Sequence, residues 1–269
     1  MLAEPSVSPA VRRLWMVGGS LAAVVVLVFG LIQAVSVLAH EEETVVTVLD
    51  DMSQLRTVEV RNGAGSVHVA GTADDAVTIT ARVSHGLRST GHGHRTEGDR
   101  LIIDASCPTI GSTFCGVTYD VEVPEDVALV VRAGNGGVTV SDVSGDVDLE
   151  SDNGRVEAVR LAGDARLRSD NGRVTGTELT SAEVDAESDN GRVELSFRRS
   201  PRAVAAASDN GRVEVVLPNR TADTDVEYRV EVSSDNGTTT NQVRTDPFSS
   251  RSIDATSDNG SVTVRYALG

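Results

Sequence analysis

The sequence beyond residue 130 alternates between apolar and polar residues on both sides of a recurring Ser-Asp-Asn-Gly tetrapeptide. Counted from the Asn, the positions six and four residues before it and three after it are apolar in nearly every copy. The first full copy has Val147, Leu149 and Val156 there. A period of two is typical of half-buried β-strands and excludes an amphipathic helix. Each unit is therefore predicted to be a strand, an Asn-Gly corner, a second strand and a second corner such as Gly145-Asp146.

The tetrapeptide returns at a near-fixed spacing. Subtracting the numbers of consecutive asparagines gives intervals of 18, 19, 20, 26 and 23 residues. The copies are centred on Asn153, Asn171, Asn190, Asn210, Asn236 and Asn259, with a degenerate copy at Asn135 and a distant one at Asn62. Self-similarity at a short fixed period is typical of repeat architectures, in which the folding unit is one repeat rather than one globular core.

Two arrangements of such repeats are possible. Asn-Gly between alternating strands is a strong signal for an antiparallel hairpin, so a β-meander is the serious alternative to a solenoid. Equivalent positions nevertheless recur with nearly the same side chain, as expected when each strand pairs in parallel with its copy one coil along. The predicted fold class is all-β, a β-solenoid or β-helix-like repeat ectodomain with one N-terminal transmembrane helix.

The corner residues have predicted roles of their own. The Ser two residues before each Asn, and the Asn itself, share the inward register of the valines, so we expect both inside the corner, with stacked asparagines hydrogen-bonding between coils. The Gly is expected to supply a positive φ. The predicted corner ladder comprises Asn135, Asn153, Asn171, Asn190, Asn210, Asn236 and Asn259, with Gly154, Gly172, Gly191 and Gly211.

The Asp of each motif and the Arg two residues after the Asn are expected to point outward. They would form two adjacent columns of opposite charge, in which the arginines offset the repulsion between stacked carboxylates. This candidate binding face comprises Asp152, Arg155, Asp170, Arg173, Asp189, Arg192, Asp209 and Arg212.

The first forty residues predict export. Residues 14–39 carry no charge, and such a helix would span about 39 Å, enough to cross a bilayer. Arg12 and Arg13 precede this segment and three glutamates follow it, so the positive-inside rule places residues 1–13 in the cytoplasm. A cleaved signal peptide is the alternative. We expect an acidic stalk at 40–55 and an extracellular β-repeat domain at 56–269, making the chain a single-pass cell-membrane protein.

Composition limits the classes of partner and of site that the chain can have. The formal net charge is −16, which argues against nucleic-acid binding. The only two cysteines, Cys107 and Cys115, follow the apolar segment, and an exported pair this close in sequence favours a structural disulfide over a metal or catalytic site. Free thiols are the alternative.

No pattern in the sequence is typical of a catalytic or cofactor site. The copies lack the Gly-Gly-x-Gly-x-Asp of calcium-binding solenoids, although Asp235 and Asp258 have no Arg beside them. His85, His92 and His94 could bind zinc or copper, but they are not accompanied by Cys or carboxylates at ligand spacing. Nucleophilic catalysis would need an elbow motif, and none is present. We expect no cofactor, no metal and no catalytic residue.

The run GDVDLESDNGRVEAVRLAGDARLRSDNGRVTG resembles the bacterial putative-adhesin β-strand repeat family, also called the toastrack domain. So do VEVPEDVALVVRAGNGGVTV before it and VEVVLPNRTADTDVEYRV after it, and the resemblance covers about residues 56 to 269. It implies a membrane-tethered surface domain of unknown function, linked by analogy to adhesion or envelope-stress sensing.

The expected function is that of a non-enzymatic, membrane-anchored binding module whose partner is a cell-surface glycan or protein. An ectodomain that senses envelope stress with a membrane partner is the alternative. A glycan-active β-helix enzyme is the remote one.

Overall fold

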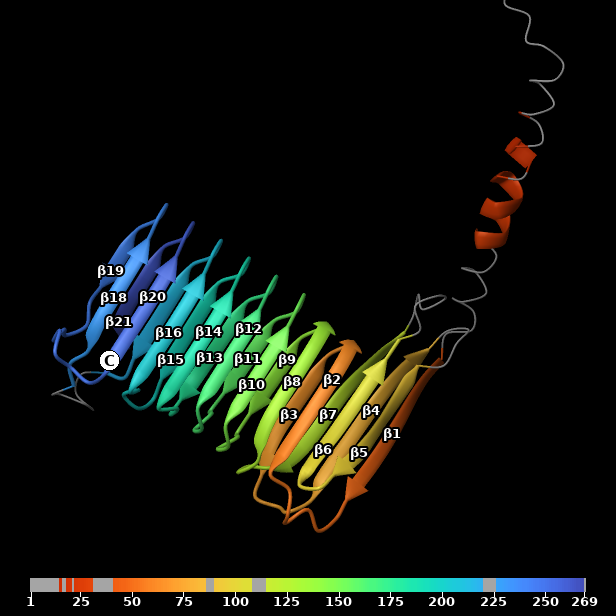
Figure 1. The fold of residues 1–269 in the computed structure, drawn as a ribbon, viewed down its shortest axis with the longest axis horizontal. Helices are drawn as coiled ribbons and strands as arrows, with labels where there is room; N and C mark the ends of the chain where they lie inside the picture. Colours follow the sequence, from red (N-terminus) through yellow and green to blue (C-terminus); the bar gives the residue numbers. More distant parts are fainter. Residues whose placement is uncertain are drawn as a thin grey trace, which may run out of the picture.

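The computed structural model describes residues 15, 18–20, 22–30, 41–85, 90–107, 115–219 and 226–268. From residue 41 onward the described chain is built of β-strands that form two facing sheets (Figure 1).

Sheet A has eleven strands. Their spatial order is β1 (Glu41–Leu49), β4 (Val77–His85), β7 (Gly116–Pro124), β3 (Val67–Thr72), β9 (Val138–Ser141), β11 (Val156–Val159), β13 (Val174–Leu179), β15 (Val193–Phe197), β17 (Val213–Leu217), β21 (Val262–Tyr266) and β19 (Thr239–Asn241). Sheet B has ten strands. Their order is β18 (Arg229–Ser234), β20 (Ser252–Ser257), β16 (Ala203–Ser208), β14 (Glu183–Ser188), β12 (Ala165–Ser169), β10 (Val147–Ser151), β8 (Ala128–Asn135), β2 (Thr57–Ala64), β6 (Arg100–Ser106) and β5 (Gly91–Glu97).

The repeats form a parallel solenoid, which confirms the prediction against the β-meander. Each coil contributes one strand to each sheet, and equivalent positions pair in register: Leu149 with Leu167 in sheet B, and Val156 with Val174 in sheet A. A tandem hairpin array would have paired β10 with β11. Instead these two strands lie in different sheets, on either side of the Asn153 corner.

The order of coils in space differs from the order in sequence at both ends. Near the C-terminus, β20 and β21 lie between the β16–β17 coil and the β18–β19 coil. Near the N-terminus, β2 and β3 lie between the β6–β7 coil and the β8–β9 coil. The lengthened intervals of 26 and 23 residues mark the C-terminal exchange, because the chain there must pass over one coil position and then return.

The N-terminal end is antiparallel. β1 pairs with β4, β4 with β7, and β5 with β6, all antiparallel. Glu41–Leu49 belong to the segment predicted as an acidic stalk, and that part of the prediction is wrong. Alternation of Val45, Thr47 and Leu49 with more exposed residues lets this segment pair with β4 as the edge strand of sheet A.

The interior is narrow and filled by small aliphatic side chains. Val, Leu and Ala at alternate positions of both sheets are buried and form one continuous core cluster. Tyr119 and Tyr228 are the largest fully buried side chains among the described residues. A sequence with 3% aromatic residues therefore still fills its core, because two sheets lying close together leave little volume between them.

The predicted transmembrane segment, residues 14–39, lies largely outside the described residues. Within it, residues 15, 18–20 and 22–30 are helical. No helix of the described residues is long and apolar enough to cross a membrane.

Cys107 and Cys115 form the predicted disulfide, with Cα atoms 5.7 Å apart. The bond joins the end of β6 to the start of β7, across residues 108–114, which lie outside the described part of the chain.

Candidate functional site: the ribbon of repeat corners

The motif serines lie inside the corner, as predicted. Ser151, Ser169, Ser188, Ser208 and Ser257 are buried. Ser169 is representative: its Oγ accepts a hydrogen bond from Gly172 N at 2.8 Å and donates one to Gly154 O of the neighbouring coil, also at 2.8 Å. Each hydroxyl thus satisfies one backbone group of its own turn and one of the coil beside it, as buried polar groups require.

The asparagines form the predicted ladder. Asn153 Nδ2 donates to Asn135 Oδ1 at 3.0 Å, and Asn171 Nδ2 donates to Asn153 Oδ1 at 3.0 Å. The same contact, at 3.0 to 3.1 Å, continues through Asn190, Asn210, Asn259 and Asn236. Asn259 precedes Asn236 in this series because of the exchanged coil order.

The predicted burial of these asparagines is wrong: their side chains are exposed along the outer edge of the corner. The inward and outward alternation of a strand ends where the backbone bends at Asp152 and Asn153. The alternation of inward and outward side chains along β10 therefore does not extend to the Asn.

Asn62, the distant copy, is no member of the ladder. It pairs with Ala133, at the serine position of the motif, and its buried Nδ2 donates to Gly65 O and Val117 O.

The motif glycines are required for a different reason from the predicted one. Among the described glycines only Gly65 and Gly98 have positive φ, so the motif glycines do not. Space is what excludes a side chain. A Cβ added to Gly172 would lie 1.9 Å from Gly154 O, and the same clash recurs at Gly191 and Gly211. The close approach of successive corners therefore selects Gly.

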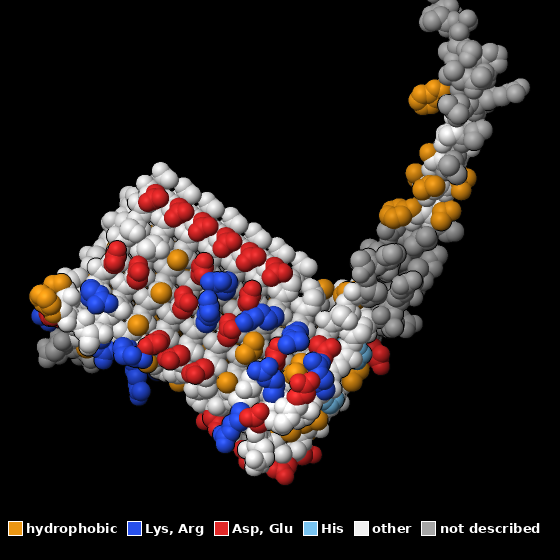
Figure 2. Space-filling model, in the orientation of Figure 1, with side chains coloured by type: hydrophobic (Ala, Val, Ile, Leu, Met, Phe, Trp, Pro, Cys, Tyr) orange, Lys and Arg blue, Asp and Glu red, His pale blue; other side chains and the backbone are white. Residues whose placement is uncertain are grey.

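The charged residues of the motif flank the Asn ladder. The aspartates occupy one register in successive coils, and a row of acidic side chains runs along one long edge of the stack (Figure 2). The expected mutual offset of the two columns is wrong at the level of contacts: within the described ranges, no ion pair joins a motif Asp to a motif Arg. Arg192 instead pairs with Glu194 at 3.5 Å, and Arg212 Nε donates to Ser261 Oγ at 3.1 Å.

A shallow groove of about 550 Å³ runs along this edge. It is lined by the asparagines of the ladder, the corner glycines and the arginine column. Its lining includes Asn171, Asn190, Asn210, Arg173, Arg192 and Arg212. Each Asn amide already donates to the next Asn, so the free hydrogen-bonding groups are guanidinium N–H donors and amide oxygen lone pairs. We call the motif aspartates, asparagines and arginines together the corner ribbon.

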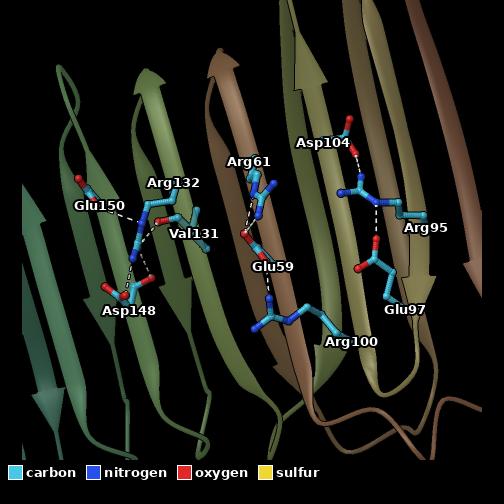
Figure 3. Close-up of polar contacts among 10 residues, drawn as sticks. All are labelled: Glu59, Arg61, Arg95, Glu97, Arg100, Asp104, Val131, Arg132, Asp148 and Glu150. Carbon is cyan, nitrogen blue, oxygen red and sulfur yellow. Dashed lines mark hydrogen bonds and ion pairs between the residues drawn. The ribbon is translucent and has the colours of Figure 1, made fainter.

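Charges elsewhere on the stack follow a different rule, which sequence reasoning missed. Across the outer face of sheet B, charged side chains of neighbouring strands form ion pairs (Figure 3). Arg100 of β6 contacts Glu59 of β2 at 3.1 Å, and Arg132 of β8 contacts both Asp148 and Glu150 of β10. The pattern continues beyond the figure, with Arg166 paired to Asp185 and Arg168 to Glu187. The signal was available in part, because the residues five and three before Asn153, Asn171 and Asn190 reverse sign between consecutive repeats.

A second alternating ladder follows the opposite corner. Asp142, Arg160 and Glu178 all have φ between 52° and 60° and stack in successive coils. Two hydrogen bonds of 2.6 Å join Arg160 to Asp142, and Arg198 pairs with Glu178 at 3.5 Å. The hydrogen bond from Arg160 lowers the pKa of the Asp142 carboxyl, and the same contact raises the pKa of Arg160.

The corner ribbon therefore differs from these alternating ladders. Alternating columns place opposite charges one coil apart, about 4.8 Å, and favour stacking. The ribbon instead repeats Asp above Asp and Arg above Arg through four coils, which opposes stacking. An arrangement that costs stability at one defined edge marks a candidate functional surface.

The other candidate sites gain no support from the geometry. His92 and His94 lie on β5 and are exposed, His85 ends β4, and no group of three or more His, Cys, Asp or Glu in the described ranges could hold a metal ion.

Parallel coils, a corner ladder and one polar ribbon define a β-solenoid repeat protein. The chain belongs to the toastrack family: the family model described as Toastrack DUF4097 matches residues 28–267. No curated protein matches the chain.

Among solved structures, a putative adhesin from Bacteroides fragilis is similar at 14% identity and a TM-score of 0.50, covering 84% of this chain and 97% of the other. A putative adhesin from Parabacteroides distasonis gives 14% identity and a TM-score of 0.47, with coverage of 84% and 97%. A putative cell adhesion protein from Clostridium sporogenes gives 8% and 0.40, with coverage of 84% and 100%. At these identities the likeness concerns the fold alone.

Proposed function

We propose that the chain is a non-enzymatic surface binding module, anchored in the membrane by residues 14–39 and acting through the corner ribbon. The observation that carries the proposal is the uniform sign of the Asp and Arg columns. Of the arginines that line the groove, only Arg192 pairs with a carboxylate among the described residues. Guanidinium groups held in a fixed row, with exposed amide oxygens beside them, suit recognition of a partner by many repeated polar contacts. The name of the similar Bacteroides fragilis structure, a putative adhesin, agrees with this class of function.

Support for a binding role over catalysis comes from the shape of the ribbon. Catalysis requires a few groups that converge on one reacting atom, usually in a concave pocket. The ribbon repeats the same groups at about 4.8 Å intervals along an open edge. Such a row gives many equivalent contacts and no unique centre.

A photo-reactive amino acid placed at Ser261, which lines the groove without carrying charge, tests this proposal. The full chain is displayed on its own cells, and added protease first establishes that the domain lies outside. We expect illumination to join a partner to the Ser261 probe and not to a probe at Ser144, an exposed residue of the opposite corner. Equal products at both positions, or none at Ser261, would contradict a binding role for the ribbon.

A further inference from the structure

The corner ribbon is complementary to a copy of itself. In each motif the Asp precedes the Asn and the Arg follows it, and the groove along the ladder is lined by the arginines but by none of the aspartates, so we infer that the two columns lie on opposite sides of the Asn ladder. Both columns keep their sign through four consecutive coils. The rungs are Asp152 with Arg155, Asp170 with Arg173, Asp189 with Arg192, and Asp209 with Arg212.

We propose that the partner of the ribbon is the ribbon of a second copy of this chain, packed with both stacks running in the same direction. This inference rests on the proposed function of the ribbon as an interaction surface, and it names the partner. The relative direction of the two stacks follows from which of the possible rotations brings opposite charges together.

Two facing ribbons can be related by a twofold axis along the stack or across it. Rotation about the stack axis exchanges the two sides of the ribbon, so each Asp column faces the Arg column of the other copy, rung by rung. Rotation about the transverse axis reverses the stack and places Asp against Asp and Arg against Arg. A twofold interface uses the same patch on both copies, so only the first arrangement is electrostatically complementary.

This pairing explains why the ribbon does not alternate in sign. Where charges alternate, as at Asp142 and Arg160, each residue already has its partner within the chain. Among the described residues, the four ribbon aspartates form no ion pair, and of the four ribbon arginines only Arg192 pairs with a carboxylate, that of Glu194. Beyond the four rungs, Ser261 and Thr238 replace the arginine beside Asp258 and Asp235, so those coils would add no pair of like charges across the interface.

The arrangement also agrees with anchoring. Two stacks that run in the same direction bring both N-terminal ends to the same side, as two chains held in one membrane require. The reversed arrangement, which would join chains on opposing cells, is the one that like charges disfavour. The ribbon is therefore inferred to mediate lateral pairing within one membrane.

Cysteine cross-linking in cells tests the geometry. Both native cysteines are in the disulfide, so added cysteines would be the only free thiols of the chain. One full-length copy carries Asp189→Cys, and a second copy with a different tag carries Arg192→Cys. The other three rungs stay intact in both copies. We expect a disulfide between the two tagged copies, at least several-fold above that from paired Ser144→Cys copies. It should decrease in 1 M salt, where the Debye length is about 3 Å.

The alternatives give different products. Asp189→Cys joined to itself would indicate the reversed arrangement and overturn the proposal, as would no product above the Ser144→Cys level. If either substitution prevents folding, Asn190→Cys replaces the pair. In the proposed arrangement Asn190 lies on the rotation axis, so a disulfide should form between two copies of this same variant. A partner found by the Ser261 probe without any cysteine product would mean that the ribbon binds a different molecule. Failure of both would also remove the proposed function.

Discussion

Arg160 and Asp142 stand one coil apart at the same corner position, both with left-handed backbone, and are joined by two hydrogen bonds of 2.6 Å. This contact exists because the solenoid stacks position 142 directly against position 160. It shows how the chain neutralises charge within itself at this corner. In the corner ribbon, by contrast, stacked charges keep one sign, as they also do at Glu194 and Glu214 of sheet A.

The Asp142–Arg160 contact predicts a pH dependence of stability. The folded pKa of Asp142 is lowered by Arg160, so its contribution is fully present above the ordinary carboxyl value of 3.8 and is lost as pH falls through the folded pKa. Asp142→Asn should therefore lower the free energy of unfolding at pH 7 and have little effect at the acid end. Urea unfolding at several pH values measures this. Asp126→Asn, an exposed carboxylate outside the ladder, is the control. A difference between wild type and Asp142→Asn that does not vary with pH would contradict the account.

A side chain added at Gly172 is expected to destabilise the fold by steric overlap rather than by backbone strain. Gly172→Ala places a Cβ 1.9 Å from Gly154 O and forces the coils apart, at a cost of about 1–3 kcal/mol or more. At Gly137 the nearest atom to an added Cβ is 3.6 Å away, so Gly137→Ala should change stability little. Arg173→Gln should change it by less than about 0.5 kcal/mol. Thermal unfolding of the three variants decides, and equal losses for Gly172→Ala and Gly137→Ala would refute the close-approach explanation.

Removal of the Ser188 hydroxyl is expected to leave two backbone groups of the corner without a hydrogen-bond partner. Its buried Oγ accepts from Gly191 N at 2.9 Å and donates to Gly172 O at 2.8 Å. Ser188→Ala leaves both backbone groups without that partner and should destabilise by about 1–3 kcal/mol. Ser144→Ala, at an exposed site, should cost less. Denaturant unfolding measures the loss of stability in both variants, and equal losses would contradict this role of Ser188.

The disulfide predicts a moderate stabilisation. Cys107 and Cys115 are eight positions apart in the sequence, and the chain-entropy model gives about 2–3 kcal/mol for so short a loop. Reduction should lower the melting temperature without unfolding the stack, since the regular coils begin after β7. Alkylation of both cysteines without reductant would show that the bond is absent from the native protein.

The sequence predicted the parallel solenoid because each inward position repeats through the coils: Leu149, Leu167 and Ala186 stand at equivalent places. It also predicted that the motif asparagines bond to one another. It did not predict their exposure, because strand parity ends at the bend. Nor did it predict that β20 lies between β16 and β18, since nearly identical repeats leave the order of coils to be decided by the connecting segments.

Pairing of charges could have been predicted and was not. Asp148, Arg166 and Asp185 reverse sign at one repeat position, and in-register stacking turns that reversal into contacts between neighbouring coils. The motif columns, by contrast, keep one sign through four coils. Uniformity indicates an available charge, whereas alternation indicates a satisfied one.

If the uniform columns serve binding and the alternating ladders serve stability, charge reversal should affect the two sets of residues differently. The most direct measurement compares binding by two charge-reversed full-length variants whose melting temperatures are also known. One carries Arg155, Arg173, Arg192 and Arg212 changed to Glu; the other carries Arg132 and Arg168 changed to Glu. We predict that the first melts close to wild type at moderate salt, where screening over about 10 Å weakens exposed repulsion, and loses the partner joined through Ser261. The second should melt lower and keep that partner. Retention of the partner by the first variant would contradict the account.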